Sequence, residues 1–488
     1  MSDRFRPLFD PDGVVVVGAS THPGKFGFVA LHNLLAAGYR GRIFGVNPEG
    51  PTVLGVPTLR DIAELPHGAA DLAFLCTPPI VNAELVKGCA ARGVRAVYVA
   101  SGGYAETGDD GRRAQDLLAA AAEESGVLLV GPNGQGLVST PSSLCAQFVA
   151  PYPPAGRIGI ASQSGNIVSS LMNLARHYGV GISRAVSVGN AARVGVSDLV
   201  EFYGADQETD VAIAYLEGIT EGRALMQRLR SVAERIPVVL AKGGRSAAGA
   251  RAATSHTGAL ATDDRVFTGA CRQAGVVRVG SVEEAYEAAA TFATQPLPAG
   301  PRVAVVTTAG GWGVLASDAI AANPTLDLVP LPDDLRAALD EALPARWSRN
   351  NPVDLAGGET KDTVPTVLGL VAHHPGVDAI VLLGLGIQGN QARMEATGPF
   401  HPDHGLDRIV GFHERQERRY QEAAADLTAE TGKPIVVATE LAVSDRDNPA
   451  VAAARARGRL CHASAERAVR ALAHVWWYAR WRRRRGLA

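Results

Sequence analysis

The chain has 488 residues, of which 47% are hydrophobic and 20% are charged, a composition typical of a globular protein with several cores. The formal net charge of -2 does not favour a general nucleic-acid-binding role. We find no apolar signal region and no run near ~18 apolar residues, so we expect a cytoplasmic protein that does not enter a membrane. The five cysteines are far apart and form no CxxC motif, which predicts reduced thiols.

The first third of the chain alternates short apolar strands with helical patterns. A helix is expected at FVALHNLLAAG (28–38), which follows the strand VVVVG and its glycine turn. The expected strands lie at 14–18, 42–48, 71–79, 95–101 and 127–133. Apolar strands that alternate with helices predict a parallel, doubly wound sheet.

The same pattern restarts twice. A proline-rich segment (149–156) precedes strands expected at 157–165, 184–190, 210–218 and 237–244. A second break (293–301) precedes strands expected at 302–311, 351–355, 377–386 and 433–440, and the chain ends in an alanine-rich helix. We therefore predict an α/β protein of three tandem doubly wound domains, at 1–148, 155–295 and 300–488.

A long polar segment at 387–432 interrupts the third domain. We expect part of it to be a helix and part a surface insertion. A polar surface loop explains His401, His404 and His413 better than a metal site does, and no metal site is predicted in the chain.

Turn-forming residues follow the expected strands of the first domain. The segment GASTHPGKFG (18–27) lies between the first strand and the first helix, where doubly wound sheets bind phosphorylated ligands. The short motifs at 46–48, 76–79, 101–103 and 131–134 each follow a strand and would line the same edge. Glycine, proline and asparagine also form ordinary turns, but the motifs together favour a nucleotide-like ligand.

Three segments of the second domain carry candidate chemistry. SQSGN (162–166) ends a strand and opens a helix, where it would either bind an anion or cap the helix. Glu217 follows an apolar strand and could orient an imidazole, although an exposed charge at a strand end is the commoner case. His256 lies among small residues in AATSHTGALA, which suits a nucleophile that large groups must approach. A Ser–His relay through Ser255 lacks the GxSxG elbow.

The order of these motifs resembles the NDP-forming acyl-CoA synthetases. That family includes the alpha subunit of ADP-forming acetate–CoA ligase and, more distantly, the succinyl-CoA synthetase alpha subunit. The resemblance covers roughly residues 10 to 385, and SHTGALA is its most diagnostic part. The matching motifs are GASxxPGKxG, VNP, GPN, SQSG, VGN, YLEGI, SHTGALA, GGxGVLASD and NPVDL.

The resemblance implies a Rossmann-like CoA-binding domain followed by two flavodoxin-like domains. It implies that His256 is phosphorylated transiently, that Glu217 steadies it, and that the helix start at Ser164, Gly165 and Asn166 holds the phosphate. CoA would contact residues 23–26. The candidate CoA-binding residues are Gly18, Ser20, Pro23, Gly24, Lys25, Phe26, Asn47, Pro48, Pro78, Ser101, Gly102 and Asn133.

The family's reaction also needs an ATP-grasp module, and no region of this chain resembles one. We therefore expect an alpha-type subunit that works with an ATP-grasp beta subunit, which would supply ADP/ATP and Mg2+. The other expected partners are a small carboxylic acid or acyl-CoA, and phosphate, in a hetero-oligomer or a homodimer. Arg193 and Gly195 occupy positions where the family more usually has acidic residues.

Two other functions are compatible with parts of the sequence. A non-catalytic CoA-binding regulatory protein would keep the fold, but the presence of both Glu217 and His256 argues against it. An NAD-dependent dehydrogenase is disfavoured because the first turn lacks GxGxxG and the second strand ends in Asn47 rather than an acidic residue.

Overall fold

The structure is a computed structural model that describes residues 2–219, 221–246, 248–249, 251, 263–355, 357 and 362–487. The chain forms two compact units, the first made of 1–176 with 181–286 and the second of 177–180 with 287–488. Within the described part of the chain, no helix combines the length and apolar character needed to cross a membrane. All five cysteines are free in the structure.

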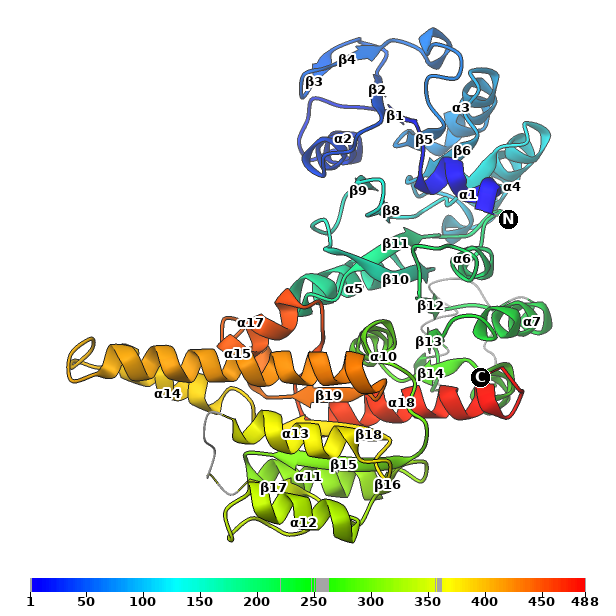
Figure 1. Ribbon diagram of the computed structural model, residues 1–488. Coiled ribbons are helices and arrows are strands. Elements are labelled where there is room, and N and C mark those ends of the chain that lie inside the picture. Colours follow the sequence, from blue (N-terminus) through cyan, green and yellow to red (C-terminus); the bar gives the residue numbers. More distant parts are fainter. Residues whose placement is uncertain are drawn as a thin grey trace. The chain divides into compact units, whose positions relative to one another are not determined.

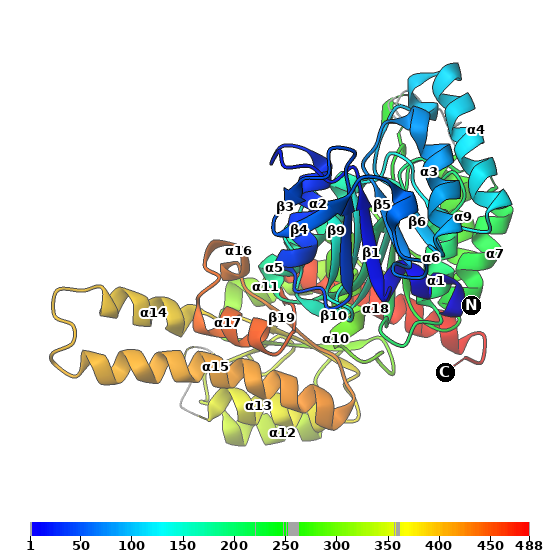
Figure 2. The same cartoon turned by 90° about the horizontal axis from the view of Figure 1, so that it is seen from above.

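The first unit contains a seven-stranded sheet in the order β3-β4-β2-β1-β5-β6-β7, parallel except for the β3–β4 pair. Its strands are β1 (Gly13–Val17), β2 (Arg42–Val46), β3 (Thr52–Val53), β4 (Val56–Leu59), β5 (Leu72–Leu75), β6 (Ala96–Val99) and β7 (Leu128–Val130). Its helices are α1 (Ser2–Phe9), α2 (Phe26–Ala36), α3 (Pro79–Ala91) and α4 (Asp109–Glu124), with short 3-10 turns at Ile62–Glu64 and Ala105–Thr107. Helix α2 lies on one side of the sheet, and α3 and α4 lie on the other (Figures 1 and 2).

The central strands of this sheet are apolar because both of their faces are covered. Every residue of β1, β5 and β6 is buried, and these strands form one core with α3 and α4. The chain winds outward in opposite directions from β1 and β5, so the topological switch point lies between them.

The second sheet of the first unit has the order β14-β13-β12-β10-β11-β8-β9. Its strands are β8 (Gly136–Ser139), β9 (Leu144–Gln147), β10 (Ala155–Ser162), β11 (Ile182–Ser187), β12 (Val211–Leu216), β13 (Val238–Lys242) and β14 (Val277–Val279). Its helices are α5 (Gly165–Tyr178), α6 (Val196–Tyr203), α7 (Gly222–Ala233) and α9 (Asp264–Ala274). Helix α10 (Val282–Thr294) follows and continues past residue 286 into the second unit. The five parallel strands follow the flavodoxin-like order, with the switch point between β10 and β12.

The β8–β9 hairpin was not predicted, and it pairs with the second sheet rather than the first. β8 runs antiparallel to β11, although residues 136–147 precede the proline-rich segment that the sequence analysis used as a boundary. Tyr98 of β6 holds the start of β8 beside the end of β11. Its buried hydroxyl donates to the Ser187 carbonyl over 2.6 Å and accepts from the Gly136 N–H over 2.7 Å. A Cβ atom on Gly134 would overlap that hydroxyl, so a glycine is required there.

The second unit contains a third, parallel sheet in the order β16-β15-β18-β19-β20, with β17 paired to β15. Its strands are β15 (Arg302–Thr307), β16 (Asp327–Leu328), β17 (Val353–Asp354), β18 (Ala379–Leu383), β19 (Ile435–Ala438) and β20 (Cys461–His462). Its helices are α11 (Gly310–Ala321), α12 (Asp333–Ala342), α13 (Thr363–His373), α14 (Ile387–Ala396), α15 (Leu406–Thr431), α16 (Leu441–Ser444), α17 (Pro449–Ala456) and α18 (Ala465–Arg483). Helices α11 and α18 pack on the strands of this sheet and share its core. The predicted fold of three tandem doubly wound sheets is confirmed.

The polar segment of the third domain is more ordered than predicted. Helices α14 and α15 run side by side and extend beyond the sheet (Figures 1 and 2). The surface-loop prediction is wrong for His413, which is 9% exposed within α15. Glu417 of α15 is 1% exposed and accepts hydrogen bonds from the N–H groups of Gly386 and Gln388, each over 2.8 Å, at the start of α14. Helix α15 therefore caps its neighbour with a buried carboxylate.

Candidate active site

The candidate CoA-binding residues lie in the turns after five parallel strands. Those turns follow β1, β2, β5, β6 and β7, so the residues share the carboxyl edge of the first sheet, where the switch point lies. Residues 23–26, which form the end of the first turn and the start of α2, are exposed. This edge is the part of the first domain that a phosphorylated ligand would reach.

The start of α2 approaches the first strand very closely. A Cβ atom on Gly27 would overlap the Gly18 carbonyl oxygen, and Gly18 itself has a φ of +87°. Lys25 precedes the helix and makes no side-chain capping hydrogen bond. Its carbonyl accepts from the Phe28 N–H over 3.0 Å, which leaves the N–H groups of Phe26 and Gly27 for an acceptor outside the described residues. The Ser20 hydroxyl is already used within its own turn, because its Oγ accepts a hydrogen bond from the His22 N–H over 3.1 Å.

Asparagines order the other turns of this edge. Asn47 donates to the Ala19 carbonyl over 2.7 Å and so joins the turns after β1 and β2. Asn82, which is fully buried in α3, donates to Ser101 Oγ over 3.0 Å and to the Tyr104 hydroxyl over 2.8 Å. The sequence analysis missed Asn82 because it lies inside a helix rather than in a turn.

A polar network links this edge to the second domain. Asn190, in the turn after β11, donates to Glu106 Oε2 over 2.6 Å, and Asn133 donates to Asn190 Oδ1 over 3.2 Å. Burial of Glu106 opposes its ionisation, but hydrogen bonds from Asn190 and from the N–H groups of Gly103 and Tyr104 outweigh it and lower its pKa. The two domains of the first unit therefore meet beside the predicted ligand edge.

The structure brings the SQSGN segment next to Glu217. SQSGN follows β10 and Glu217 follows β12, which are adjacent strands on the two sides of the switch point. Gln163 joins them, since its Oε1 accepts from the N–H groups of Glu217 over 2.5 Å and Gly218 over 3.1 Å. The sequence analysis gave no role to Gln163, because its function depends on which strands become neighbours.

The side chain of Glu217 is half-buried at the ends of β12 and β13. A Cβ atom built on Gly243 would lie 3.1 Å from the Tyr215 hydroxyl and 3.8 Å from Glu217 Cγ. Burial raises the pKa of Tyr215, and the nearby charge of Glu217 raises it further. His256 lies outside the described residues, so only the Glu217 and SQSGN parts of the predicted site are described.

Helix α5 begins at Gly165, within the predicted phosphate site. Ser162 Oγ accepts from the Ser164 N–H over 3.0 Å and donates to the Ser164 carbonyl over 2.7 Å, which holds the turn before the helix. Asn166 is exposed, and its Oδ1 accepts from Gln135 Nε2 over 3.0 Å. The Ser162 hydroxyl is thus used within its own turn, and α5 starts at the carboxyl end of β10, beside the switch point.

The third sheet repeats this turn geometry before α11, which the sequence analysis did not predict. Thr307 Oγ1 accepts from the Ala309 N–H over 2.9 Å and donates to the Ala309 carbonyl over 2.8 Å. Thr308 Oγ1 donates to the Gly384 carbonyl over 2.7 Å, as Gln163 Nε2 donates to Gly218 over 3.3 Å. The common sequence signal is a hydroxyl residue three positions before the first helical residue, Ser162 before Gly165 and Thr307 before Gly310.

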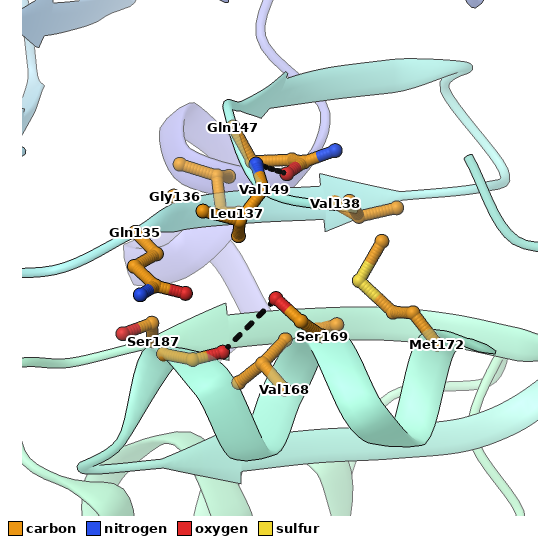
Figure 3. A pocket seen from close by; sticks show the side chains of 12 residues that line it. Gln135, Gly136, Leu137, Val138, Gln147, Val149, Val168, Ser169, Met172 and Ser187 are labelled. Atoms are coloured by element: carbon orange, nitrogen blue, oxygen red, sulfur yellow. Dashed lines mark hydrogen bonds between the residues drawn. The ribbon is translucent and has the colours of Figure 1, made fainter. Parts of the chain in front are cut away.

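A small cavity of about 10 Å3 lies between the β8–β9 hairpin and α5 (Figure 3). The residues that line it are Gln135, Gly136, Leu137, Val138, Gln147, Val149, Gly165, Val168, Ser169, Met172, Ala185 and Ser187. Gly165 and Val168 belong to the first turn of α5, so the cavity adjoins the predicted phosphate site.

Arg193 and Gly195 have structural partners. Arg193 Nη1 pairs with Glu123 Oε2 over 2.9 Å, and the Gly195 N–H donates to Asp198 Oδ2 over 2.9 Å at the start of α6. These contacts are with α4 and α6 rather than with the SQSGN turn. In the described part of the chain, no cluster of three or more metal-ligating side chains is present.

Family models match the first sheet and parts of the second and third. A CoA binding domain matches residues 13–139, a succinyl-CoA ligase like flavodoxin domain matches 155–292, and a Ligase-CoA domain matches 303–387. The fold and its sheet edges thus define a CoA-binding domain followed by domains of the succinyl-CoA ligase type.

Individual proteins agree with these matches. The alpha subunit of ADP-forming acetate–CoA ligase I from Pyrococcus furiosus is 31% identical over 97% of this chain and 98% of that protein. The alpha subunit of ligase II from the same organism is 34% identical over 78% of this chain and 82% of that protein. The solved structure of dinucleotide forming acetyl-coenzyme A synthetase 1 from Ca. Korarchaeum cryptofilum, in complex with phosphate and ADP, matches with a TM-score of 0.84, 29% identity and 100% coverage of both chains.

The chain therefore belongs to the NDP-forming acyl-CoA synthetase family, among its ADP-forming acid–CoA ligases of the alpha type. This confirms the resemblance seen in the sequence. It also favours an enzyme over the non-catalytic CoA-binding protein considered as an alternative.

Proposed function

We propose that this chain is the alpha-type subunit of an ADP-forming acid–CoA ligase, which interconverts acyl-CoA, ADP and phosphate with acid, CoA and ATP. The observation that carries the proposal is the hydrogen bond from Glu217 to Gln163, because it joins the candidate acidic residue to the candidate phosphate-binding turn. Both lie at a switch point, the usual ligand site of such sheets.

CoA would bind at the carboxyl edge of the first sheet. The uncapped start of α2 offers backbone N–H groups to a phosphate, Lys25 offers a positive charge, and the close approach of Gly27 to Gly18 lets a ligand lie against the backbone. The other candidate residues in the turns after β2, β5, β6 and β7 would line the same site. The match to a CoA binding domain over 13–139 supports this assignment.

The chemistry would proceed in three transfers. An oxygen of phosphate attacks the thioester carbonyl, the C–S bond breaks, and CoA leaves with a proton. An imidazole nitrogen of His256 then attacks the phosphorus of the acyl phosphate, and the carboxylate leaves. The phosphoryl group finally passes from His256 to ADP.

The protein groups of the second domain would support these transfers. The helix start at Ser164, Gly165 and Asn166 would stabilise the phosphoryl charge through backbone N–H groups. Glu217 would accept a hydrogen bond from the His256 ring, which fixes the tautomer and raises the basicity of the attacking nitrogen.

The last transfer would take place on an ATP-grasp beta subunit, which would hold the nucleotide and Mg2+. The relatives described above are named as alpha subunits, which supports a separate partner. The free cysteines are typical of a reducing compartment and support a cytoplasmic location.

The test is phosphate transfer to the protein. The purified chain is incubated with radiolabelled phosphate and an acyl-CoA, and acid-labile phosphoprotein is measured. We expect labelling of the wild type and of His67→Asn, an exposed histidine in the first domain, and loss of labelling in His256→Asn. CoA binding, measured by calorimetry, should be unchanged in both variants. Labelling of His256→Asn at the wild-type level would disprove the assignment.

A further inference from the structure

Gln135 lies in the segment that joins the first sheet to the second, and the backbone is held on both sides of it. The Gly136 N–H donates to the buried Tyr98 hydroxyl over 2.7 Å, and a Cβ atom on Gly134 would overlap the same hydroxyl. The backbone at Gln135 is therefore fixed where the two sheets meet, which determines what its side chain can reach.

The side chain of Gln135 lies directly on the first residue of α5. A Cβ atom built on Gly165 would overlap the Cγ, Cδ and Oε1 atoms of Gln135, so the carboxamide occupies the space that a larger residue would need. Its Nε2 donates to Asn166 Oδ1 over 3.0 Å. Both contacts are with the helix start that is proposed to bind the phosphoryl group.

The two ends of this carboxamide have different surroundings. Its Oε1 is buried and has no hydrogen-bond partner among the described residues, whereas Nε2 makes its hydrogen bond with the exposed side chain of Asn166. The Oγ of Ser187, a residue that is 1% exposed, is also buried without a partner in the described part of the chain. Gln135 and Ser187 both line the cavity beside α5 and lie at the same end of it (Figure 3).

The cavity has room for one water molecule beside these two polar side chains. Its volume of about 10 Å3 is close to that of a single water, and buried polar atoms nearly always have hydrogen-bond partners. A water there would accept from the Ser187 hydroxyl and donate to Gln135 Oε1. Because this holds the amide oxygen in the cavity, it turns Nε2 toward the helix start.

We propose that Gln135 is a further phosphate-binding residue of the site and that its Nε2 donates a hydrogen bond to the transferred phosphoryl group. An amide nitrogen carries two hydrogens, and Asn166 accepts one of them. The second is left for a ligand beside Gly165, where the backbone N–H groups of α5 would bind the same phosphate. This inference rests on the proposed function, since it adds a residue to the phosphoryl site of that reaction.

The test is the rate of labelling of the purified full-length chain at a series of radiolabelled phosphate concentrations. The acyl donor is whichever of acetyl-CoA, butyryl-CoA and benzoyl-CoA labels the wild type fastest. Gln135→Met keeps the length of the side chain but removes the donor. We expect the phosphate concentration for half-maximal labelling to rise about tenfold or more, since a hydrogen bond to a charged group has about that effect. The affinity for free CoA should stay unchanged, and Gln227→Met, which alters an exposed glutamine of α7, should match the wild type in both measurements.

Gln135→Glu gives a readout that a purely structural role would not change. The carboxylate of this variant repels phosphate at pH 8, whereas its protonated form can donate a hydrogen bond again. The loss of labelling rate relative to the wild type should therefore shrink as the pH falls from 8 to 5. No titratable side chain lines the cavity among the described residues, so this change reports on position 135. Ser187→Ala removes one partner of the water and should raise the half-maximal phosphate concentration by a smaller factor, about two- to tenfold.

The outcomes separate this inference from the proposed function. A labelled wild type with unchanged phosphate dependence in Gln135→Met would overturn the role of Gln135 and leave the proposed function standing. A loss in Gln135→Glu that stays constant with pH would overturn that role as well, and this profile decides alone if circular dichroism shows that Gln135→Met is unfolded. An unchanged Ser187→Ala would refute the bridging water. A wild type that none of the three thioesters labels would overturn the proposed function and this inference together.

Discussion

Gln163 accepts the backbone N–H of Glu217 over 2.5 Å and so ties together the ends of two strands whose residues are 54 positions apart. The same amide donates to the Gly218 carbonyl over 3.3 Å. A single side chain therefore sets the position of Glu217 relative to the turn before α5. This makes Gln163 a positioning residue rather than a group that touches the substrate.

Replacement of Gln163 by alanine should slow the phosphorylation of the protein. The N–H groups of Glu217 and Gly218 would lose their acceptor, and Glu217 would no longer be held in place. We expect the labelling rate to fall about 10- to 100-fold, as for other residues that orient a reacting group, whereas CoA affinity should stay unchanged. Gln163→Glu keeps the acceptor and should recover part of the rate. Gln273→Ala, an exposed change on α9, serves as the control, and equal rates for all variants would refute the role of Gln163.

Replacement of Gly27 by alanine should destabilise the first domain and weaken CoA binding. The added Cβ atom would overlap the Gly18 carbonyl oxygen, which is backbone and cannot swing away. We expect the free energy of unfolding to fall by about 1–3 kcal/mol, as for other overpacked sites, in a urea titration followed by circular dichroism. Gly269→Ala in α9 is the matched control, because nothing lies within 4 Å of its added Cβ atom. An equal loss of unfolding free energy in both variants would contradict the steric explanation.

The second unit should lose stability in mild acid because of His462. Burial, and then the charges of Arg467 and Arg470, lower the pKa of this histidine from 6.5 to about 3. Between these values the unfolded chain binds a proton that the folded chain does not bind. The free energy of unfolding therefore keeps its full value above pH 6.5. It falls as the pH drops toward 3, by at most about 1.4 kcal/mol per pH unit.

The measurement is urea unfolding at a series of pH values. His462→Gln should have a flatter profile than the wild type below pH 6.5, whereas His67→Gln, an exposed control, should follow the wild type. A wild-type profile that His462→Gln leaves unchanged would show that other groups cause the acid sensitivity.

The central strands of the three sheets could be predicted because most of them are short apolar runs followed by glycine, proline or asparagine. The short strands β3, β4, β14, β16 and β20 were not predicted, since two to four residues carry too little pattern. The same signal placed Glu217 and Ser164 at strand ends. The role of Gln163 could not be predicted, since it arises only when β10 and β12 become neighbours. The burial of His413 and Glu417 could not be predicted from the sequence. Helix α15 is rich in charged residues, and its buried face is itself largely polar.

The β8–β9 hairpin escaped prediction for a different reason. Its strands have only four residues each, and nothing local reports that their partner is β11, which lies more than forty residues along the chain from Gly136. Local pattern identifies a strand, whereas tertiary contacts decide the sheet that it joins.

The pairing of β8 with β11 also determines how this protein can be recombined with its relatives. A cut at the proline-rich segment (149–156) would leave the hairpin on the CoA-binding domain and expose the edge of β11 in the donor of the second domain. An exchange of CoA-binding domains should instead join the chains between Asn133 and Gly136, so that the hairpin and its sheet are inherited together. Tyr98 would then have to accompany a matching Gly134, because the two residues meet across that junction.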